Sequence, residues 1–214
     1  DLEPSFFEVT TVATFLAFSR IPADACVIET GLGGRLDATN VMPTAAVCGI
    51  ATLGLDHEAF LLAPEAGVPT DPLARIAFEK ASIAKPGVPL VTMAYPERAT
   101  ASVIETAARI GEPVIMRGRE WDADVSGSIL YRDACGELAL PLPALPGVHQ
   151  AENAALAVAM IRHQNAVQVS LSAMNKGIVA ARWPARLQRL GGGPISDLAG
   201  GRTGWKPVPH LHEL

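Results

Sequence analysis

The chain has 214 residues with a formal net charge of −5 at pH 7; 49% of the residues are hydrophobic and 18% are charged. This composition is typical of a globular protein with a substantial core and not of a disordered chain. The acidic balance gives no indication of a nucleic-acid partner or of an acidic membrane surface. It does not exclude an anionic nucleotide, because a local site can oppose the net charge of the whole chain.

No stretch of the sequence indicates a membrane or secretory segment. The longest apolar run, within 11–18, has about eight residues, whereas a helix that crosses a bilayer needs roughly 20. The opening residues DLEP lack the basic stretch of a signal peptide. The widely spaced Cys26, Cys48 and Cys135 are predicted to be buried, reduced thiols. We therefore expect a cytoplasmic monomer with no membrane and no nucleic acid as partner.

Apolar periodicity predicts helices that alternate with short buried strands over the first half of the chain. Residues 6–19 have helical spacing, and the apolar run 25–29 predicts a buried parallel strand that enters a glycine-rich loop. The remaining predictions are helices at 72–84 and 99–110 and strands at 45–53, 88–93 and 113–116. Strands that alternate with helices imply right-handed crossovers and a largely parallel sheet.

The pattern changes after residue 120. Alternation over 124–131, with a turn near 133–136, predicts an antiparallel hairpin, and helices are predicted again at 151–163 and 171–182. The fold class that follows is α/β, with a mostly parallel sheet flanked by helices and a small antiparallel annex. We expect this domain to extend over 1–190, followed by an irregular tail at 191–214 that is rich in glycine and proline.

The most specific stretch is ETGLGGRLDATN, residues 29–40. Glu29 stands at the carboxyl end of a predicted strand, and the glycines after it allow backbone amides to approach a bound group closely. The run begins the pattern G-x-G-x-x-G, but Leu36 replaces the third glycine, and no P-loop pattern G-x-x-x-x-G-K-[ST] occurs in the chain. On the residues alone, a tight structural turn is the alternative to a ligand-binding loop.

Two further residues are candidates for a site. His57 follows another predicted strand beside a carboxylate, which suits a metal or phosphate role as well as a packed or surface histidine. Lys80 lies in a largely apolar helix, where a lysine whose stem is buried and whose ammonium reaches solvent is the ordinary interpretation.

Six segments together resemble the folylpolyglutamate synthase/dihydrofolate synthase family of the Mur ligase superfamily. They are SFFEVT from Ser5, ETGLGGRLDATN from Glu29, LDH from Leu55, FEKASIAKPG from Phe78, LPGVHQAENAA from Leu145 and ARWPARLQ from Ala181. They occur in the order of that family. The resemblance is to its central portion only, and it implies a Mur ligase-like central domain related to P-loop NTPases.

The resemblance implies an ATP-dependent ligase that joins L-glutamate to dihydropteroate or a folate. In that chemistry a carboxylate is phosphorylated by ATP, and the glutamate amine then displaces phosphate from the acyl phosphate. Glu29 and His57 match Mg²⁺ ligands of the family. Lys80 matches a carbamylated lysine, a modification that turns a cation into an anion and so removes its repulsion of a metal.

The resemblance also implies positions for the pterin and for ATP. The segments that match pterin contacts comprise Ser5, Phe6, Phe7, Glu8, Leu36, Asp37 and Ala38. Asn153 matches a residue that contacts ATP, and Arg186 matches an arginine on the nucleotide phosphates. On the residues alone, Asn153 could lie on an exposed helix face and Arg186 could be a surface charge.

The chain departs from the family pattern in three ways. The family's P-loop is expected before Asp1, so the resemblance predicts a partial ATP-binding domain that lacks its P-loop. After Leu190 neither the Asp-Gly-Ala-His-Asn-like motif nor the carboxy-terminal domain follows, and the nearest acid is Asp197. The spacing between His57 and Lys80 (80 − 57 = 23) is about eight residues longer than the resemblance predicts, which indicates a loop insertion at 63–69. We expect the insertion to bulge into solvent; the alternative is that it moves Lys80 relative to the metal.

Three interpretations of function are therefore open. The first is the glutamate ligase, impaired in this chain. The second is a non-catalytic remnant that folds and at most binds a pterin weakly. The third is a Mur ligase that acts on a cell-wall precursor, against which SFFEVTT and WPARLQ count.

Overall fold

The computed structural model describes residues 3–21 and 23–183. At its centre lies a parallel sheet of three strands in the order β1-β2-β3. These strands are β1 (Cys48–Ile50), β2 (Leu90–Thr92) and β3 (Val114–Met116). The register aligns Cys48 with Leu90 and Leu90 with Val114, so the three strands end together at one carboxyl edge.

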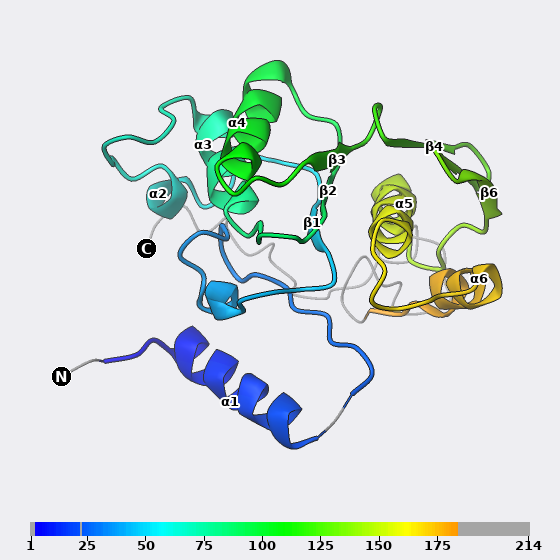
Figure 1. Ribbon diagram of the computed structural model, residues 1–214, viewed down its shortest axis with the longest axis horizontal. Helices are drawn as coiled ribbons and strands as arrows, with labels where there is room; N and C mark the ends of the chain where they lie inside the picture. Colours follow the sequence, from blue (N-terminus) through cyan, green and yellow to red (C-terminus); the bar gives the residue numbers. More distant parts are fainter. Residues whose placement is uncertain (1–2, 22, 184–214) are drawn as a thin grey trace, which may run out of the picture.

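Helices α3 (Pro72–Ala81) and α4 (Glu97–Ala108) connect successive strands of this sheet and lie side by side on one side of it (Figure 1). Helix α3 begins where the Asp71 carboxylate accepts a hydrogen bond from the Ala74 amide at 3.0 Å and where Pro72 supplies a preset φ. The core between the helices and the sheet includes Ala77, Ala81, Val88, Leu90, Ala99 and Val103.

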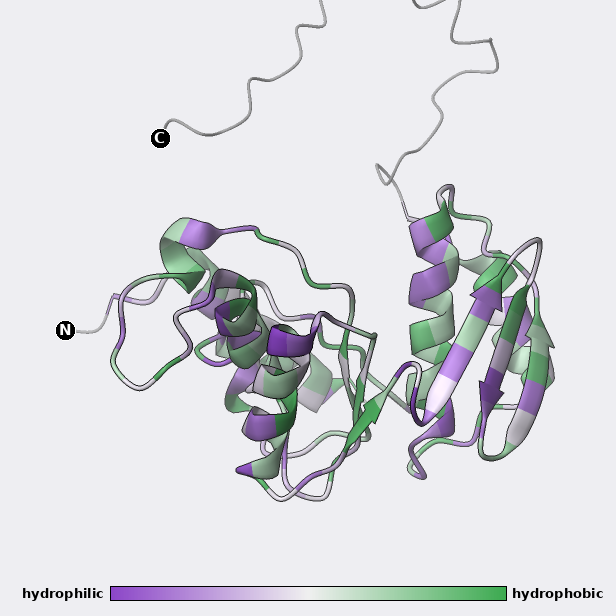
Figure 2. Cartoon of the chain, turned by 90° about the horizontal axis from the view of Figure 1, so that it is seen from above, coloured by the Kyte–Doolittle hydropathy of each residue, from purple (hydrophilic) through white to green (hydrophobic). Residues whose placement is uncertain are grey.

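Helix α5 (Val148–Arg162) covers the opposite face of the parallel sheet and stands between the two sheets of the molecule (Figure 2). It approaches β1 closely because residue 49 is glycine: a Cβ there would lie 2.3 Å from the sulfur of Met160.

The second sheet is antiparallel and has three strands, β4 (Trp121–Val125), β5 (Ile129–Asp133) and β6 (Gly136–Leu140). The buried rings of Trp121 and Tyr131 stack with their centroids 5.8 Å apart, in the core that this sheet forms with α5. Helix α6 (Leu171–Ala180) follows α5.

Helix α1 (Phe6–Arg20) lies along the outside of the molecule (Figure 1). Thr11 is its buried residue, and its exposed apolar side chains include Phe6, Val9, Val12, Leu16 and Phe18. A short 3-10 helix, Ala38–Val41, lies between α1 and β1 in the chain, and the short helix α2 (Glu58–Leu61) follows β1 and packs on α3. Packing therefore contributes little to α1, whose start is held locally by a capping box.

The predicted α/β class, with a parallel sheet and a small antiparallel sheet, is confirmed. The strands predicted over 45–53 and 88–93 are shorter, because only three residues of each form ladder hydrogen bonds. The run 124–131 is not a single strand, since the chain turns at Gly127, which has a φ of +85°.

Residues 25–29 do not form the predicted strand. The segment has no regular secondary structure, and Val27 is 96% exposed. No strand in the described part of the chain pairs with it. An apolar run without a neighbouring strand has no ladder hydrogen bonds, so its composition alone misled the prediction.

Other expectations from the sequence have mixed outcomes. All three cysteines are free, but only Cys48 is buried, so the prediction of burial is wrong for Cys26 and Cys135, which lie in exposed connections. Arg186 and the tail at 191–214 lie outside the described residues. Within the described ranges, no helix has both the length and the apolar character needed to cross a membrane.

A buried carboxylate fastens the antiparallel sheet to α5. The side chain of Asp133 is 1% exposed and accepts two hydrogen bonds from the Arg162 guanidinium, both at 2.6 Å. The Tyr131 hydroxyl, at 3.1 Å, and the Cys135 amide, at 2.8 Å, donate to the same carboxylate. The Arg162 guanidinium above all, aided by the other donors and opposed by burial, holds the pKa of Asp133 below its ordinary value.

We predict that Asp133→Asn lowers the free energy of unfolding by about 2–4 kcal/mol, because it leaves the Arg162 guanidinium without its counter-charge. Urea denaturation would measure the change. The control is Asp124→Asn, at an exposed carboxylate of the same sheet, which should stay within about 0.5 kcal/mol of the unmodified chain.

The same pair gives a pH dependence. Because the folded-state pKa of Asp133 lies below the unfolded value, the stabilisation is complete above the unfolded pKa and is lost as the pH falls through the folded pKa. The difference between Asp133→Asn and the unmodified chain should therefore shrink below about pH 4. An equal loss of unfolding free energy in Asp133→Asn and Asp124→Asn would contradict the prediction. So would a difference between Asp133→Asn and the unmodified chain that stays the same at acidic pH.

Candidate functional site

The glycine-rich segment after Glu29 is folded around one carboxylate. Asp37 accepts hydrogen bonds from the amides of Gly31, Leu32 and Thr39, each at 2.9 Å, and from the Thr39 hydroxyl at 2.6 Å. Burial raises the pKa of Asp37, but the bonds from Thr39, Leu32 and Gly31 outweigh burial and hold the pKa below its ordinary value. Residues 31–39 therefore form a compact loop around an ionised side chain, which we call the glycine loop.

Three helices meet the glycine loop at its glycines. A Cβ on Gly31 would lie 2.5 Å from the ring of Phe7 on α1, and one on Gly33 would lie 2.8 Å from Leu61 on α2. A Cβ on Gly34 would lie 2.8 Å from the Glu79 carbonyl and 3.3 Å from the Cα of Lys80 on α3. The approach at Gly34 leaves no room for a side chain because it meets backbone atoms, and the φ of +65° at Gly33 favours glycine there.

Hydrogen bonds join the glycine loop and the residue after it to the end of α3. The Arg35 amide donates to the Glu79 carbonyl at 2.9 Å, and the Asn40 side-chain amide donates to the Ser82 carbonyl at 3.2 Å. The Lys85 ammonium donates to the Asn40 backbone carbonyl at 3.0 Å and to its side-chain oxygen at 2.8 Å. The two most specific segments of the sequence, ETGLGGRLDATN and FEKASIAKPG, thus form one structural unit.

A cluster of four charges lies at the same junction. Arg35 donates to both oxygens of the buried Glu79 carboxylate at 3.0 Å, and Arg75 donates to one of them at 2.9 Å. Both arginines also donate to Glu65, at distances between 2.5 and 3.0 Å. Hydrogen bonds to Glu79 and then to Glu65 raise the pKa of Arg35, and the Arg35 guanidinium lowers the pKa of Glu65.

Glu65 belongs to the insertion that the sequence predicted at 63–69. Residues 63–67 are exposed, as a bulge requires. The insertion is not free in solvent, however, because Glu65 ties it to Arg35 and Arg75. The expectation of a plain bulge is therefore corrected: the loop is held against α3 and the glycine loop by ion pairs.

The residues that match metal ligands, Glu29 and His57, are both exposed. Glu29 lies in the irregular segment before the glycine loop. His57 precedes α2 in a left-handed conformation, with a φ of 53°, and its ring lies 3.7 Å from the Asp56 carboxylate. A non-glycine residue in this conformation is uncommon and occurs more often at functional positions.

The donor set at Glu29 and His57 fits magnesium only in part. In the described ranges, no group of three or more His, Cys, Asp or Glu side chains is placed to hold a metal. Mg²⁺ in proteins commonly takes one or two carboxylates and completes its shell with substrate phosphates and water. Glu29 offers the oxygen ligand that Mg²⁺ prefers, so these residues could hold the ion only together with a bound phosphate.

Lys80 is half-buried on α3, with its Cα beside Gly34. Its ammonium makes no hydrogen bond or ion pair with any residue that the structure describes. The neighbouring Lys85, by contrast, is bound to Asn40 at 2.8 Å. Among the described residues, Lys80 therefore has no charge partner, although its Cα lies beside the glycine loop.

The residues that match pterin contacts fall into two groups. Ser5 and Glu8 form the capping box of α1, with the Ser5 amide and hydroxyl each 2.7 Å from the Glu8 carboxylate, and the Asp37 carboxylate organises the glycine loop. Phe6 and Leu36 are instead exposed apolar side chains, at 84% and 82%. Phe7 lies between these groups, since its ring covers Gly31, and Ala38 begins the 3-10 helix.

Asn153 is exposed on α5, as the alternative interpretation of a surface position also predicted. Its neighbour Glu152 binds the Arg117 guanidinium, which comes directly after β3. The Tyr95 hydroxyl donates to the carbonyls of Ile50 and Ala51, at 2.7 and 2.8 Å, after β1. Polar contacts thus gather at the carboxyl edge of the parallel sheet, where open α/β sheets place ligands.

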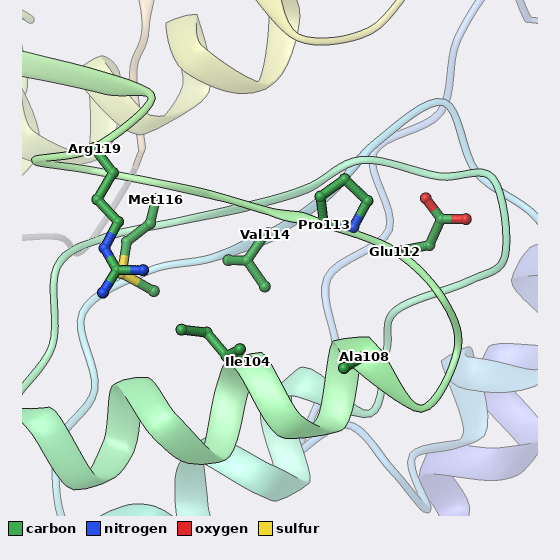
Figure 3. Close-up of a pocket in the computed structure, with 7 residues that line it drawn as sticks. All are labelled: Ile104, Ala108, Glu112, Pro113, Val114, Met116 and Arg119. Carbon is green, nitrogen blue, oxygen red and sulfur yellow. The ribbon is translucent and has the colours of Figure 1, made fainter.

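A separate hollow of about 280 Å³ lies between α4 and the edge strand β3 (Figure 3). Its lining is apolar apart from Glu112 and Arg119. None of the site residues predicted from the sequence lines it, so it gives no support to the ligand positions considered above.

The four-charge cluster was missed by sequence reasoning. One part of it leaves a local signal, because Arg75 and Glu79 are four residues apart on one helix and so face each other. The partners Arg35 and Glu65 come from other segments and leave no periodic trace.

The chain is similar in sequence to known proteins. No family model matches the chain. The chain is 33% identical over 205 residues to a probable bifunctional folylpolyglutamate synthase/dihydropteroate synthase of Halobacterium salinarum, with 92% of this chain and 24% of that protein covered. It is 33% identical over 199 residues to the dihydrofolate synthase/folylpolyglutamate synthase of Bacillus subtilis, with 87% and 44% covered.

Solved structures agree with these relatives. The apo form of L. casei FPGS superposes with a TM-score of 0.75 and 28% identity, over 90% of this chain and 47% of that one. E. coli FolC in complex with ADP gives a TM-score of 0.73 and 32% identity, over 88% and 42%. The chain spans about a quarter to a half of the length of the proteins that it matches. The resemblance of the six segments is thereby confirmed: over about 90% of its length, the chain belongs to the folylpolyglutamate synthase/dihydrofolate synthase family.

Proposed function

We propose that this chain is the central portion of an ATP-dependent ligase that joins L-glutamate to dihydropteroate or a folate. The observation that carries the proposal is the union of the glycine loop with the end of α3, which places Gly34 against Lys80. Related proteins support the ligand classes, since solved structures include an FPGS-AMPPCP-folate complex and E. coli FolC with DHPP and ADP.

In the proposed reaction, the γ-phosphoryl group of ATP passes to the pterin-linked carboxylate, which gives an acyl phosphate and ADP. The glutamate amine then attacks the acyl carbon, phosphate leaves with the bonding electrons, and the amine loses a proton as the amide forms. The exposed apolar side chains of Phe6 and Leu36 would pack on the pterin ring. Asn153 would bind the adenine edge, and Arg186 would offset charge on the phosphates.

Glu29 and His57 would hold Mg²⁺ together with the nucleotide phosphates, as their donor set allows. The ion, when bound, supplies neutralisation of phosphate charge. An unmodified Lys80 ammonium close to that ion would repel it, whereas a carbamate on the lysine would be an anion suited to a divalent cation. In carbamylation the ammonium first loses one proton, and the neutral nitrogen then forms a bond to the carbon of CO₂ with the release of a second proton.

A second candidate is a polypeptide that folds without catalysis and at most binds a pterin weakly. Residues 1–214 contain no G-x-x-x-x-G-K-[ST] run. In nucleotide-dependent ligases of P-loop type, such a loop cradles the transferring phosphate and stabilises its charge.

One assay tests whether these 214 residues are catalytic by themselves. We predict that the purified 214-residue chain releases ADP very slowly with Mg²⁺, ATP, dihydropteroate and L-glutamate, because no phosphate-cradling loop is present in its sequence. A full-length enzyme of the family, assayed in parallel, is the positive control. Robust ligation by this chain would contradict the prediction and would show that other residues stabilise the phosphate.

A second prediction concerns the metal. In the presence of ATP, Glu29→Gln should weaken Mn²⁺ binding, measured by electron paramagnetic resonance, by at least about ten-fold, since loss of even an outer-shell partner costs 10–100-fold. Glu58→Gln removes an exposed carboxylate beside His57 and is the matched control, expected to bind as the unmodified chain does. The metal proposal fails if the two variants bind Mn²⁺ alike.

A third prediction concerns Lys80. Incubation with ¹³C-bicarbonate should give a carbamate signal in the NMR spectrum, because the half-buried Lys80 side chain has no hydrogen-bond or ion-pair partner among the described residues that would block the nitrogen. The signal should vanish in Lys80→Arg and persist in Lys176→Arg, which changes an exposed lysine on α6. A signal that persists in Lys80→Arg, or a Lys80 side chain shown to face away from Glu29 and His57, would refute the role.

A further inference from the structure

The insertion between His57 and Lys80 contributes a charged group to the site. The Glu65 side chain is 42% exposed, and its two carboxylate oxygens accept three hydrogen bonds from arginines. Two of these come from Arg35 in the glycine loop and one comes from Arg75 on α3.

The charges alternate around this cluster. Arg35 binds both carboxylates, because it also donates two hydrogen bonds to Glu79, each at 3.0 Å. Arg75 is buried and shares the same two acids. Two guanidiniums and two carboxylates give a net charge of zero, and paired hydrogen bonds of this kind fix orientation as well as distance.

We propose that Glu65 is a positioning residue that holds the glycine loop in the conformation needed for ligand binding. The segment 63–69 is then linked through Glu65 to both the glycine loop and α3 and holds the two together. The proposal rests on the proposed function in one respect, which is that Leu36, next to Arg35, contacts the pterin.

Loss of the Glu65 charge would disturb the charge balance of the cluster. Arg35 and Arg75 would then share the single carboxylate of Glu79, and the cluster would carry one excess positive charge in a partly buried place. Like charges so close repel each other, and Arg35 is the less buried of the two. Arg35 would therefore move, and with it the backbone bond from its amide to Glu79.

Hydrogen exchange measured by mass spectrometry tests this on the 214-residue chain. Glu65→Gln, nearly the same size but uncharged, should speed exchange of the amides at 31–37 by about two- to ten-fold. Exchange in β2 should not change, since its residues are buried and none of them is bonded to the cluster. Glu58→Gln, an exposed acid on the neighbouring α2, is the matched control and should change neither region.

The salt dependence of hydrogen exchange distinguishes a charge interaction of Glu65 from a packing interaction, because salt screens only the charge interaction. In 1 M KCl the screening length falls to about 3 Å, so the unmodified chain should approach the exchange rate of Glu65→Gln at 31–37. The variant itself should respond little to salt. Unchanged exchange at 31–37 would overturn the proposal, and so would equal acceleration of 31–37 and β2, because that result means general destabilisation.

A folate titration, followed by fluorescence, separates this proposal from the proposed function. If the unmodified chain binds folate, Glu65→Gln should weaken binding by a factor similar to its effect on exchange, and undiminished binding by the variant would overturn the role in ligand binding. If the unmodified chain binds no folate, the pterin part of the proposed function fails, and the exchange and salt results still decide whether Glu65 positions the loop.

Discussion

The Glu79 carboxylate is buried, and a carboxylate in the interior must be paired or pay a large desolvation penalty. One partner, Arg75, comes from the same helix one turn earlier. The other, Arg35, is 44 residues away in the sequence, and its guanidinium can reach Glu79 only if the glycine loop lies against α3. The need to pair the buried Glu79 carboxylate with Arg35 therefore fixes the glycine loop against α3.

That constraint sets how close the backbones must come. The Arg35 amide bonds to the Glu79 carbonyl, and Gly34 then lies so near that carbonyl that a Cβ would be 2.8 Å from it. On its other side the loop is closed by Asp37, which accepts four hydrogen bonds from within the segment. A loop determined from both sides keeps its shape before any ligand binds, and such preorganisation lowers the entropic cost of binding.

Local signals in the sequence predicted what depends on local physics. The capping box of Ser5 and Glu8 and the Asp71-Pro72 start mark helices that form where expected. The strand at 25–29 could not be judged locally, since a strand exists only through a neighbour that pairs with it. The Arg35–Glu79 pair was equally hidden, because a contact across 44 residues leaves no periodicity, and the family resemblance gave the segments without giving their contacts.

The polar groups around the glycine loop divide into two kinds. Asp37, Glu79 and Asn40 have their hydrogen bonds satisfied by the fold itself. Glu29 and Lys80 have no side-chain partner among the residues that the structure describes, and neither is removed from solvent entirely. The first three residues hold the glycine loop and α3 together, and we call them the frame. Glu29 and Lys80 are not needed for that structural role, because neither side chain forms a bond within the frame. These two charges belong to the same segments as the frame, so the proposed magnesium site and the proposed carbamylation both depend on groups that the frame leaves accessible.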